Sequence, residues 1–152
     1  LEKNGVKIVE RSSWYRSAPV PVSNQPWFIN AVVAVQTHLK SGDLLDLLLF
    51  TEERLGRTRS STNQPRVVDL DLIAYKNQVG TLKTPSGNHL TIPHPRLHQR
   101  KFVLLPIFDI ASDWCHPVSQ TTITELINKL SEKQVIKKVN DSNGFCGSEF
   151  FI

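Results

Sequence analysis

The sequence contains little cysteine and no long hydrophobic run. Its two cysteines, Cys115 and Cys146, lie far apart and form no CxxC motif, and the first residues do not have the pattern of a signal peptide. The longest apolar runs, at residues 47–50 and 102–107, are much shorter than the roughly 20 residues that a membrane-spanning helix needs. We therefore expect a cytoplasmic protein in a reducing compartment, without a membrane partner.

The glycine-rich sequences with which many proteins hold nucleotide phosphates are also absent. The chain contains neither GxxxxGKS/T nor GxGxxG, and it lacks the GxSxG motif of many hydrolases. If the protein binds ATP, it does so through arginine side chains and metal ions. The formal net charge of +4 favours an anionic partner but is too small to indicate nucleic acid, which we do not expect as a partner.

The chain has the size of one domain. Its 152 residues include no repeat and no low-complexity segment, and 39% hydrophobic with 21% charged residues is ordinary for a globular protein. Residues 1–152 are therefore predicted to form a single domain. Residue periodicity predicts strands at 6–15, 27–37, 67–75 and 135–139, and helices at 43–55 and from residue 123 onward. Because strands precede and follow the helices, the predicted class is α+β with two layers.

The strand predicted at residues 27–37 is apolar on both faces. Alternate side chains of a strand point to opposite faces, so Phe28 and Asn30 share one face while Ile29 and Val33 share the other. A strand buried on both sides is central in its sheet. Asn30 is costly in such a place unless it has a polar partner, which we therefore expect.

The helices carry three local predictions. Ser41 is predicted to cap the helix at 43–55, and Gly56 follows it as a stop signal. Glu52 falls close to the leucine stripe of that helix and is predicted to face inward. Thr122 and Glu125 have the spacing of a capping box at the start of the last helix.

Two carboxylates occupy alternate positions in the strand predicted at residues 67–75. Side chains two residues apart on a strand point to the same side, with Cα atoms about 6.5–7 Å apart. Asp69 and Asp71 can therefore bind one hard cation or a pair of them. On an otherwise apolar strand a positive group must meet them, because buried unpaired carboxylates are costly. The same pattern also fits an exposed edge strand whose acids face water.

Three arginines precede this strand. Arg57, Arg59 and Arg66 lie in or next to residues 56–65, which contain no aliphatic residue and have the composition of a mobile surface loop. Phosphoryl transfer relies on arginines and metal-binding carboxylates to neutralise charge, and these residues fit that chemistry. The alternative is a solvated basic loop, or surface ion pairs with nearby glutamates that contribute little.

The segment PHPRLHQRKF, residues 93–102, forms a second basic cluster. His94 and His98 have a spacing that can bind zinc on a helix, but Pro95 between them breaks the helix. His94 and Arg100 are better interpreted as phosphate donors, with turn residues that bond backbone carbonyls as the alternative.

Several segments together resemble a known family. In order they are SSWYRSAPV (12–20), QPWFINAVVAVQT (25–37), ERLGRTR (53–59), PRVVDLDLIAY (65–75), IPHPRLHQRKFVLLPIFDIA (92–111) and DWCHP (113–117). With these segments the chain resembles the 6-hydroxymethyl-7,8-dihydropterin pyrophosphokinases of folate biosynthesis. The resemblance implies a ferredoxin-like two-layer sandwich, with a mostly antiparallel central sheet and helices packed on it. It also implies transfer of a pyrophosphoryl group from Mg-ATP to the hydroxymethyl oxygen of the pterin, with release of AMP.

The resemblance assigns catalytic and nucleotide-binding roles. It implies that Asp69 and Asp71 hold two Mg²⁺ ions that bridge the triphosphate of ATP, the co-substrate. It also implies a flexible lid whose guanidinium groups reach the phosphates on closure, formed by Arg57, Arg59 and Arg66. The remaining matches are His94 and Arg100 at nucleotide-site positions and Leu72 at the position near the adenine.

The implied pterin-binding residues come from three parts of the chain. Asn30 corresponds to an asparagine whose amide pairs with the edge of the heterocycle, and Phe28 projects from the same face. Phe102 matches an aromatic residue that stacks on the pterin. A loop whose backbone groups contact the pterin corresponds to Ser17, Ala18 and Val20. The implied partners are ATP and 6-hydroxymethyl-7,8-dihydropterin, and we expect a monomer or a weak homodimer.

Three departures from the family pattern matter. Asn63 and Gln64 stand where many members carry tryptophan and glycine, so the lid lacks one aromatic contact over the pterin. Pro95 stands where some members have tyrosine, so an aromatic contact with the nucleotide is not implied. Family members also begin with a strand and a helix, containing a G-S-N motif, ahead of the position that matches Leu1. We expect these residues to precede Leu1 in the natural protein.

Three other functions stay open from the residues. A nucleic-acid-binding module fits the basic charge but does not explain paired carboxylates, which would repel phosphate without metal. A metal-dependent nuclease or phosphohydrolase would use Asp69 and Asp71 but needs further acidic ligands that the sequence does not identify. The third is an inactive relative kept for partner binding.

Overall fold

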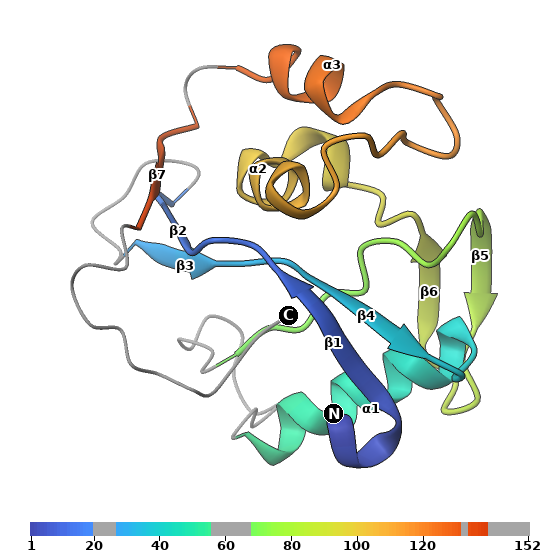
Figure 1. Cartoon of the computed structure of the whole chain (residues 1–152). Helices are drawn as coiled ribbons and strands as arrows, with labels where there is room; N and C mark the ends of the chain where they lie inside the picture. Colours follow the sequence, from blue (N-terminus) through green and yellow to red (C-terminus); the bar gives the residue numbers. More distant parts are fainter. Residues whose placement is uncertain (20–26, 56–67, 132–133, 140–152) are drawn as a thin grey trace.

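The computed structural model describes residues 1–19, 27–55, 68–131 and 134–139 (Figure 1). Its strands are β1 (Val6–Arg11), β2 (Tyr15–Ser17), β3 (Phe28–Asn30), β4 (Val33–Thr37), β5 (Gly80–Lys83), β6 (His89–Ile92) and β7 (Ile136–Lys138). Its helices are α1 (Ser41–Arg54), α2 (Lys101–Ile110) and α3 (Ile123–Asn128), with short 3-10 helices η1 (Glu2–Asn4) and η2 (Leu97–Gln99). Antiparallel strands with helices beside them confirm the α+β class.

The early strands form one long antiparallel hairpin that bends in its middle. β1 pairs with β4, and β2 pairs with β3. At the bend, the Ser12 N–H donates to the Val32 carbonyl at 2.9 Å, and the Val32 N–H donates to Ser12 Oγ at 2.9 Å. Ser12 is hydrogen-bonded to both the N–H and the carbonyl of Val32. These two bonds connect the β1–β4 pair to the β2–β3 pair.

The prediction of one central strand at residues 27–37 is therefore wrong. The segment is split into β3 and β4, and β3 lies at the edge of a sheet with the order β3-β2-β7. Phe28 and Ile29, which are adjacent in β3 and so point to opposite faces, are 53% and 47% exposed, so neither face of β3 is fully buried. The short strand predicted at residues 135–139 is confirmed as β7, which pairs with the other side of β2.

Residues 68–75 form no strand, so the strand predicted at 67–75 is wrong for its described part. No described strand pairs with the segment. It is held instead by the Leu70 N–H, which donates to Glu52 Oε1 at 2.6 Å, and by the His94 N–H, which donates to the Ile73 carbonyl at 2.8 Å. The backbone of this segment is thus hydrogen-bonded to the Glu52 side chain and to His94 in a loop, and not to a neighbouring strand.

The leucines of helix α1 pack against β1 and against residues 68–72. Val6, Leu44, Leu48 and Leu70 form one buried cluster. The predicted cap at Ser41 is wrong, because Ser41 is already helical and the helix is preceded by Lys40 without a side-chain cap. Glu52 does face inward, as predicted, and is 2% exposed.

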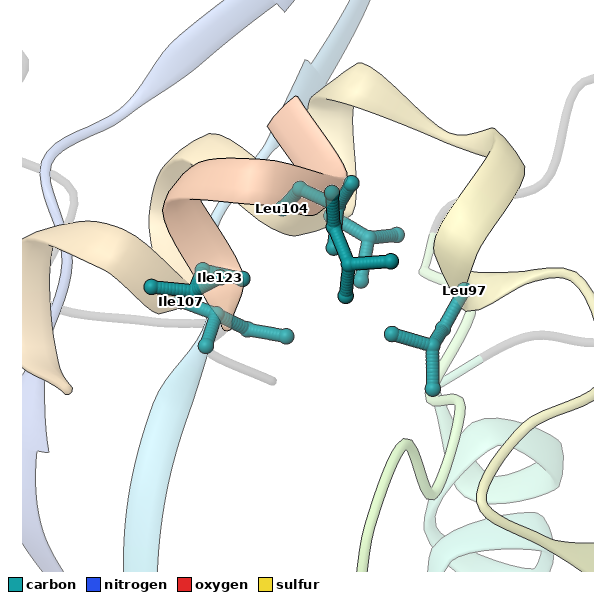
Figure 2. Packing of buried hydrophobic residues seen from close by; sticks show 6 residues of the cluster. Leu97, Leu104, Ile107 and Ile123 are labelled. Atoms are coloured by element: carbon teal, nitrogen blue, oxygen red, sulfur yellow. The ribbon is translucent and has the colours of Figure 1, made fainter. Parts of the chain in front are cut away.

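A second core lies between α2 and α3. Figure 2 shows Leu97, Leu104, Ile107 and Ile123 converging there. α3 begins with the predicted capping box, in which Glu125 N–H donates to Thr122 Oγ1 and Thr122 N–H donates to the Glu125 carboxylate. Figure 1 shows α2 and α3 together on one side of the bent hairpin and α1 on the other. Within the described ranges, no helix has the length and apolar character needed to span a membrane.

The β5–β6 hairpin is tied to α1 by one carboxylate. Asp46 accepts hydrogen bonds from Thr84 Oγ1 at 2.6 Å, from the Ser86 N–H at 2.9 Å and from Asn88 Nδ2 at 3.0 Å. Desolvation raises the pKa of Asp46, but these hydrogen bonds outweigh it and lower the pKa to about 2. The hairpin is therefore held by an ionised carboxylate at neutral pH.

Candidate active site

Asp69 and Asp71, the residues before and after the buried Leu70, are both exposed. The Leu70 side chain packs against α1, and its N–H bonds to the inward-facing Glu52. In extended backbone the neighbours of an inward side chain point outward. The two carboxylates are therefore presented on the outer side of the segment, as predicted, although no strand carries them.

This pair fits the ligand preference of Mg²⁺. Among the described residues, no group of three or more His, Cys, Asp or Glu side chains lies together. Mg²⁺ usually keeps several waters and binds through one or two carboxylates together with the phosphates of a substrate. Asp69 and Asp71 supply such a set of oxygen donors, whereas the crowded protein cage of a Ca²⁺ or zinc site would need more ligands.

Arg100 connects the carboxylates to an aromatic ring. Its Nη1 lies 3.5 Å from Asp71 Oδ2, with the Arg100 side chain 19% exposed and the Asp71 side chain 48% exposed. The Arg100 guanidinium also lies 5.5 Å from the centroid of the Phe102 ring. A cation held over an aromatic face and beside an acid keeps its donors directed to one place.

His94 lies on the same side of the molecule. Burial lowers its pKa most, while Asp71 acts in the opposite direction and Arg100 and Arg96 add to the lowering. Its Nδ1 accepts the Arg96 N–H at 3.1 Å, which assigns the proton of the neutral imidazole to Nε2. His94 therefore offers one N–H donor next to Arg100 and Asp71.

The described members of the predicted pterin-binding set lie on or directly after β2 and β3, or on α2. Asn30 Nδ2 donates to Ser17 Oγ at 2.9 Å, and this confirms that Asn30 has a polar partner. Ser17 is buried and pairs in register with Phe28, while the Ala18 N–H donates to the Val135 carbonyl at 3.1 Å. α2, which carries Phe102, contacts both β2 and β3.

Phe102 lies beside the charged residues of the candidate site. It touches Arg100 on one side, and it packs at the margin of the α2–α3 core together with Val32 and Ile73. Leu72 is half-buried against the α1 cluster. The predicted residues Val20, Arg57, Arg59 and Arg66 lie outside the described residues, and their roles stay predictions.

Sequence reasoning missed Asp109, which lies in the last turn of α2. Its carboxylate contacts Ser13, Tyr15 and Lys138, which come from distant parts of the chain. The available signal is an acidic residue at a helix C-terminus, where the helix dipole disfavours negative charge. That signal becomes readable only once residues 101–110 are known to be helical.

Comparisons with known proteins agree with the resemblance. Residues 1–112 match the family model described as 7,8-dihydro-6-hydroxymethylpterin-pyrophosphokinase. The chain is 39% identical over 130 residues to the Haemophilus influenzae 2-amino-4-hydroxy-6-hydroxymethyldihydropteridine pyrophosphokinase, covering 86% of this chain and 78% of that protein. It is 40% identical over 126 residues to the Synechocystis protein of the same name, covering 83% of this chain and 62% of the relative. The mitochondrial folate synthesis bifunctional protein of Pisum sativum is 37% identical over 110 residues, which are 72% of this chain and 20% of that protein.

Proposed function

Since the chain belongs to the 7,8-dihydro-6-hydroxymethylpterin pyrophosphokinase family, we propose that it transfers a diphosphate group from ATP to the hydroxymethyl oxygen of 6-hydroxymethyl-7,8-dihydropterin in folate biosynthesis. One observation supports this most directly. Asp71, Arg100 and Phe102 form a continuous series of contacts. A part of the site suited to metal and phosphate thus adjoins a part suited to an aromatic heterocycle.

The phosphate side uses the charged residues around Asp71. Asp69 and Asp71 would hold two Mg²⁺ ions, which supply positive charge to the triphosphate oxygens. Arg100 and the Nε2–H of His94 donate to the phosphates, and Leu72 borders the adenine. We also propose phosphate-binding roles for Arg57, Arg59 and Arg66, which lie outside the described residues.

The pterin side is organised by the bond between Asn30 and Ser17. Because Ser17 Oγ accepts one amide proton, it fixes the plane and orientation of the Asn30 amide. The amide can then pair with the edge of the heterocycle, while Phe102 stacks on its face. The remaining contacts come from Phe28 and from the loop residues Ser17, Ala18 and Val20.

In the reaction, a bond forms between the hydroxymethyl oxygen and the β-phosphorus of ATP. The bond from the β-phosphorus to the oxygen that bridges to the α-phosphorus breaks, and AMP leaves with that oxygen. The hydroxyl proton passes to solvent, because no described residue is assigned as a general base. Arg100 and His94 keep the phosphates in line for this displacement, which is mainly a matter of position and charge.

We further propose that residues 1–152 form one domain of the ferredoxin-like type that acts in the cytoplasm as a monomer or weak homodimer. The antiparallel pairing and the helices on two sides of the hairpin support the arrangement. The thiol of Cys115 is exposed and forms no disulfide with a described residue, which suits a reducing compartment. Light scattering during size exclusion tests the oligomeric state, and a stable large assembly would contradict it.

The deciding experiment measures AMP. The chain is incubated with Mg-ATP, with and without the reduced hydroxymethylpterin, and nucleotides are separated by chromatography. We expect AMP together with pterin diphosphate in equal amounts, and no AMP without the pterin. Equal hydrolysis in both reactions would indicate a phosphohydrolase. No turnover would contradict the proposal, and salt-dependent binding of nucleic acid would then favour a binding module.

A further inference from the structure

The Asp109 carboxylate joins three elements of the fold. Its Oδ2 accepts the Ser13 N–H at 3.1 Å, and its Oδ1 accepts the Tyr15 hydroxyl at 3.1 Å and the Lys138 ammonium at 3.2 Å. Tyr15 and Lys138 are partners in the register of β2 and β7. One side chain at the end of α2 therefore binds that helix to both strands.

These contacts stabilise the negative charge of Asp109 at the C-terminus of α2, where the helix dipole disfavours it. A carboxylate in the last turn of a helix opposes the helix dipole, yet the Asp109 side chain is only 18% exposed. Burial raises the pKa of Asp109, but hydrogen bonds from Ser13, Lys138 and Tyr15 outweigh it and lower the pKa. Burial, and then Asp109 itself, raise the pKa of Tyr15 to about 12, so its hydroxyl remains a donor.

Asp109 also shares a helix face with the proposed stacking residue. Phe102 and Asp109 are separated by close to two turns, so both side chains lie on one face, roughly 10 Å apart along the axis. α2 contacts β2 and β3, and Ser17 follows Tyr15 along β2. Phe102 lies on α2, and Asn30 and Ser17 lie on β3 and β2, so the position of α2 on β2 affects the distance between Phe102 and the Asn30–Ser17 pair.

We propose that Asp109, Tyr15 and Lys138 form a positioning anchor, which fixes the distance between Phe102 and the Asn30–Ser17 pair, the residues proposed to bind the pterin. The proposal rests on the proposed function, and it assigns no chemical step to the three residues. Lys138 lies beyond residues 1–112, which match the family model. The last described strand therefore takes part in substrate positioning.

The test compares Asp109→Asn with Asp46→Asn. Asp46 is a matched control, because it too accepts three hydrogen bonds but joins α1 to the β5–β6 hairpin. Loss of a charged acceptor is expected to raise the KM for the pterin on the order of ten-fold in Asp109→Asn, with the KM for ATP changed less than about two-fold. Asp46→Asn is expected to lower the melting temperature while leaving both KM values unchanged.

Two further variants and a direct measurement complete the test. Tyr15→Phe, which removes one hydroxyl, and Lys138→Met are expected to raise the pterin KM, whereas Lys138→Arg preserves it because the cation remains. If Asp109→Asn does not fold, the variants of Tyr15 and Lys138 test the anchor instead. An unchanged pterin KM in these variants, or an equal rise of the pterin KM in Asp46→Asn, overturns the anchor but leaves the proposed function intact.

If the wild-type chain makes no AMP, the proposed function fails. Fluorescence titration with the pterin then tests the anchor separately, and equal affinity of wild type and Tyr15→Phe for the pterin overturns it.

Discussion

Asp71 carries the clearest test of the proposed chemistry. Its side chain is half exposed and reaches Arg100 at 3.5 Å, so its removal changes little of the core. We expect Asp71→Ala to slow AMP formation by about 10³-fold, because the carboxylate proposed to hold Mg²⁺ against developing charge is lost. The measurement is the initial rate at saturating ATP, pterin and Mg²⁺.

Asp113→Ala provides the matched control for Asp71. Asp113 is also an exposed acid, and its carboxylate has no hydrogen-bond or ion-pair partner among the described residues. Its replacement is expected to leave the rate and the melting temperature unchanged. A near-normal rate for Asp71→Ala at saturating Mg²⁺ would contradict the metal assignment, and an equal loss in Asp113→Ala would indicate a general effect of charge.

Single positions were predictable where a short pattern decides their environment. Glu52 faces inward because helical spacing places it beside leucines. Asn30 has the expected polar partner, although the buried central strand from which that partner was inferred does not form. Asp109 was not predictable in this way. Its partners are Ser13, Tyr15 and Lys138, and only the assembled fold brings residues so far apart in sequence to one carboxylate.

The capping box of α3 is expected to contribute measurably to stability. Thr122→Ala removes the hydroxyl that accepts the Glu125 N–H, and loss of such a cap costs about 1 kcal/mol. Thr124→Ala is the control, because Thr124 is exposed within the same helix and alanine has the higher helix propensity. Urea unfolding measures both variants, and equal midpoints would show that the cap does not stabilise α3.

The β5–β6 hairpin gives a prediction for pH. The pKa of Asp46 is lowered from 3.8 to about 2 in the folded chain. Its contribution to stability is therefore complete above about pH 4 and is lost as the pH falls toward 2. The difference in urea midpoint between wild type and Asp46→Asn is expected to shrink between pH 5 and pH 3. A difference that stays constant over this range would show that the ionised carboxylate does not hold the hairpin.

The elements that escaped prediction are those shaped by contacts between distant residues. α2 was not predicted, because Pro106 interrupts a sequence that also follows several other prolines, and its place in the buried α2–α3 core compensates for the lost backbone bond. The strand at residues 27–37 was predicted as continuous, because its apolar pattern does not show that Ser12 takes the backbone groups of Val32. Helix α3 and β7 were predicted because capping and alternation are local.

The candidate site lies where the two cores of the molecule meet. Leu70 and Leu72 pack with the α1 cluster, whereas Ile73 and Phe102 pack with the α2–α3 cluster. The leucines on either side of Asp71 therefore pack with one core, whereas Phe102, which lies beside Arg100, packs with the other. A ligand held by both sets of residues binds across the boundary, and its binding energy stabilises the contact between the two cores.

Binding of Mg-ATP should consequently raise the unfolding temperature of both cores together. At a ligand concentration of about 100 times Kd the stabilisation is about 2.7 kcal/mol, which corresponds to roughly 5–10 °C for a chain of this size. Calorimetry is expected to show one transition that moves upward with Mg-ATP and returns when EDTA removes the metal. Asp71→Ala is expected to lose most of this shift, because its carboxylate no longer holds the metal that joins ATP to the α1 side. A ligand-induced shift confined to one of two separate transitions would instead place the nucleotide within a single core.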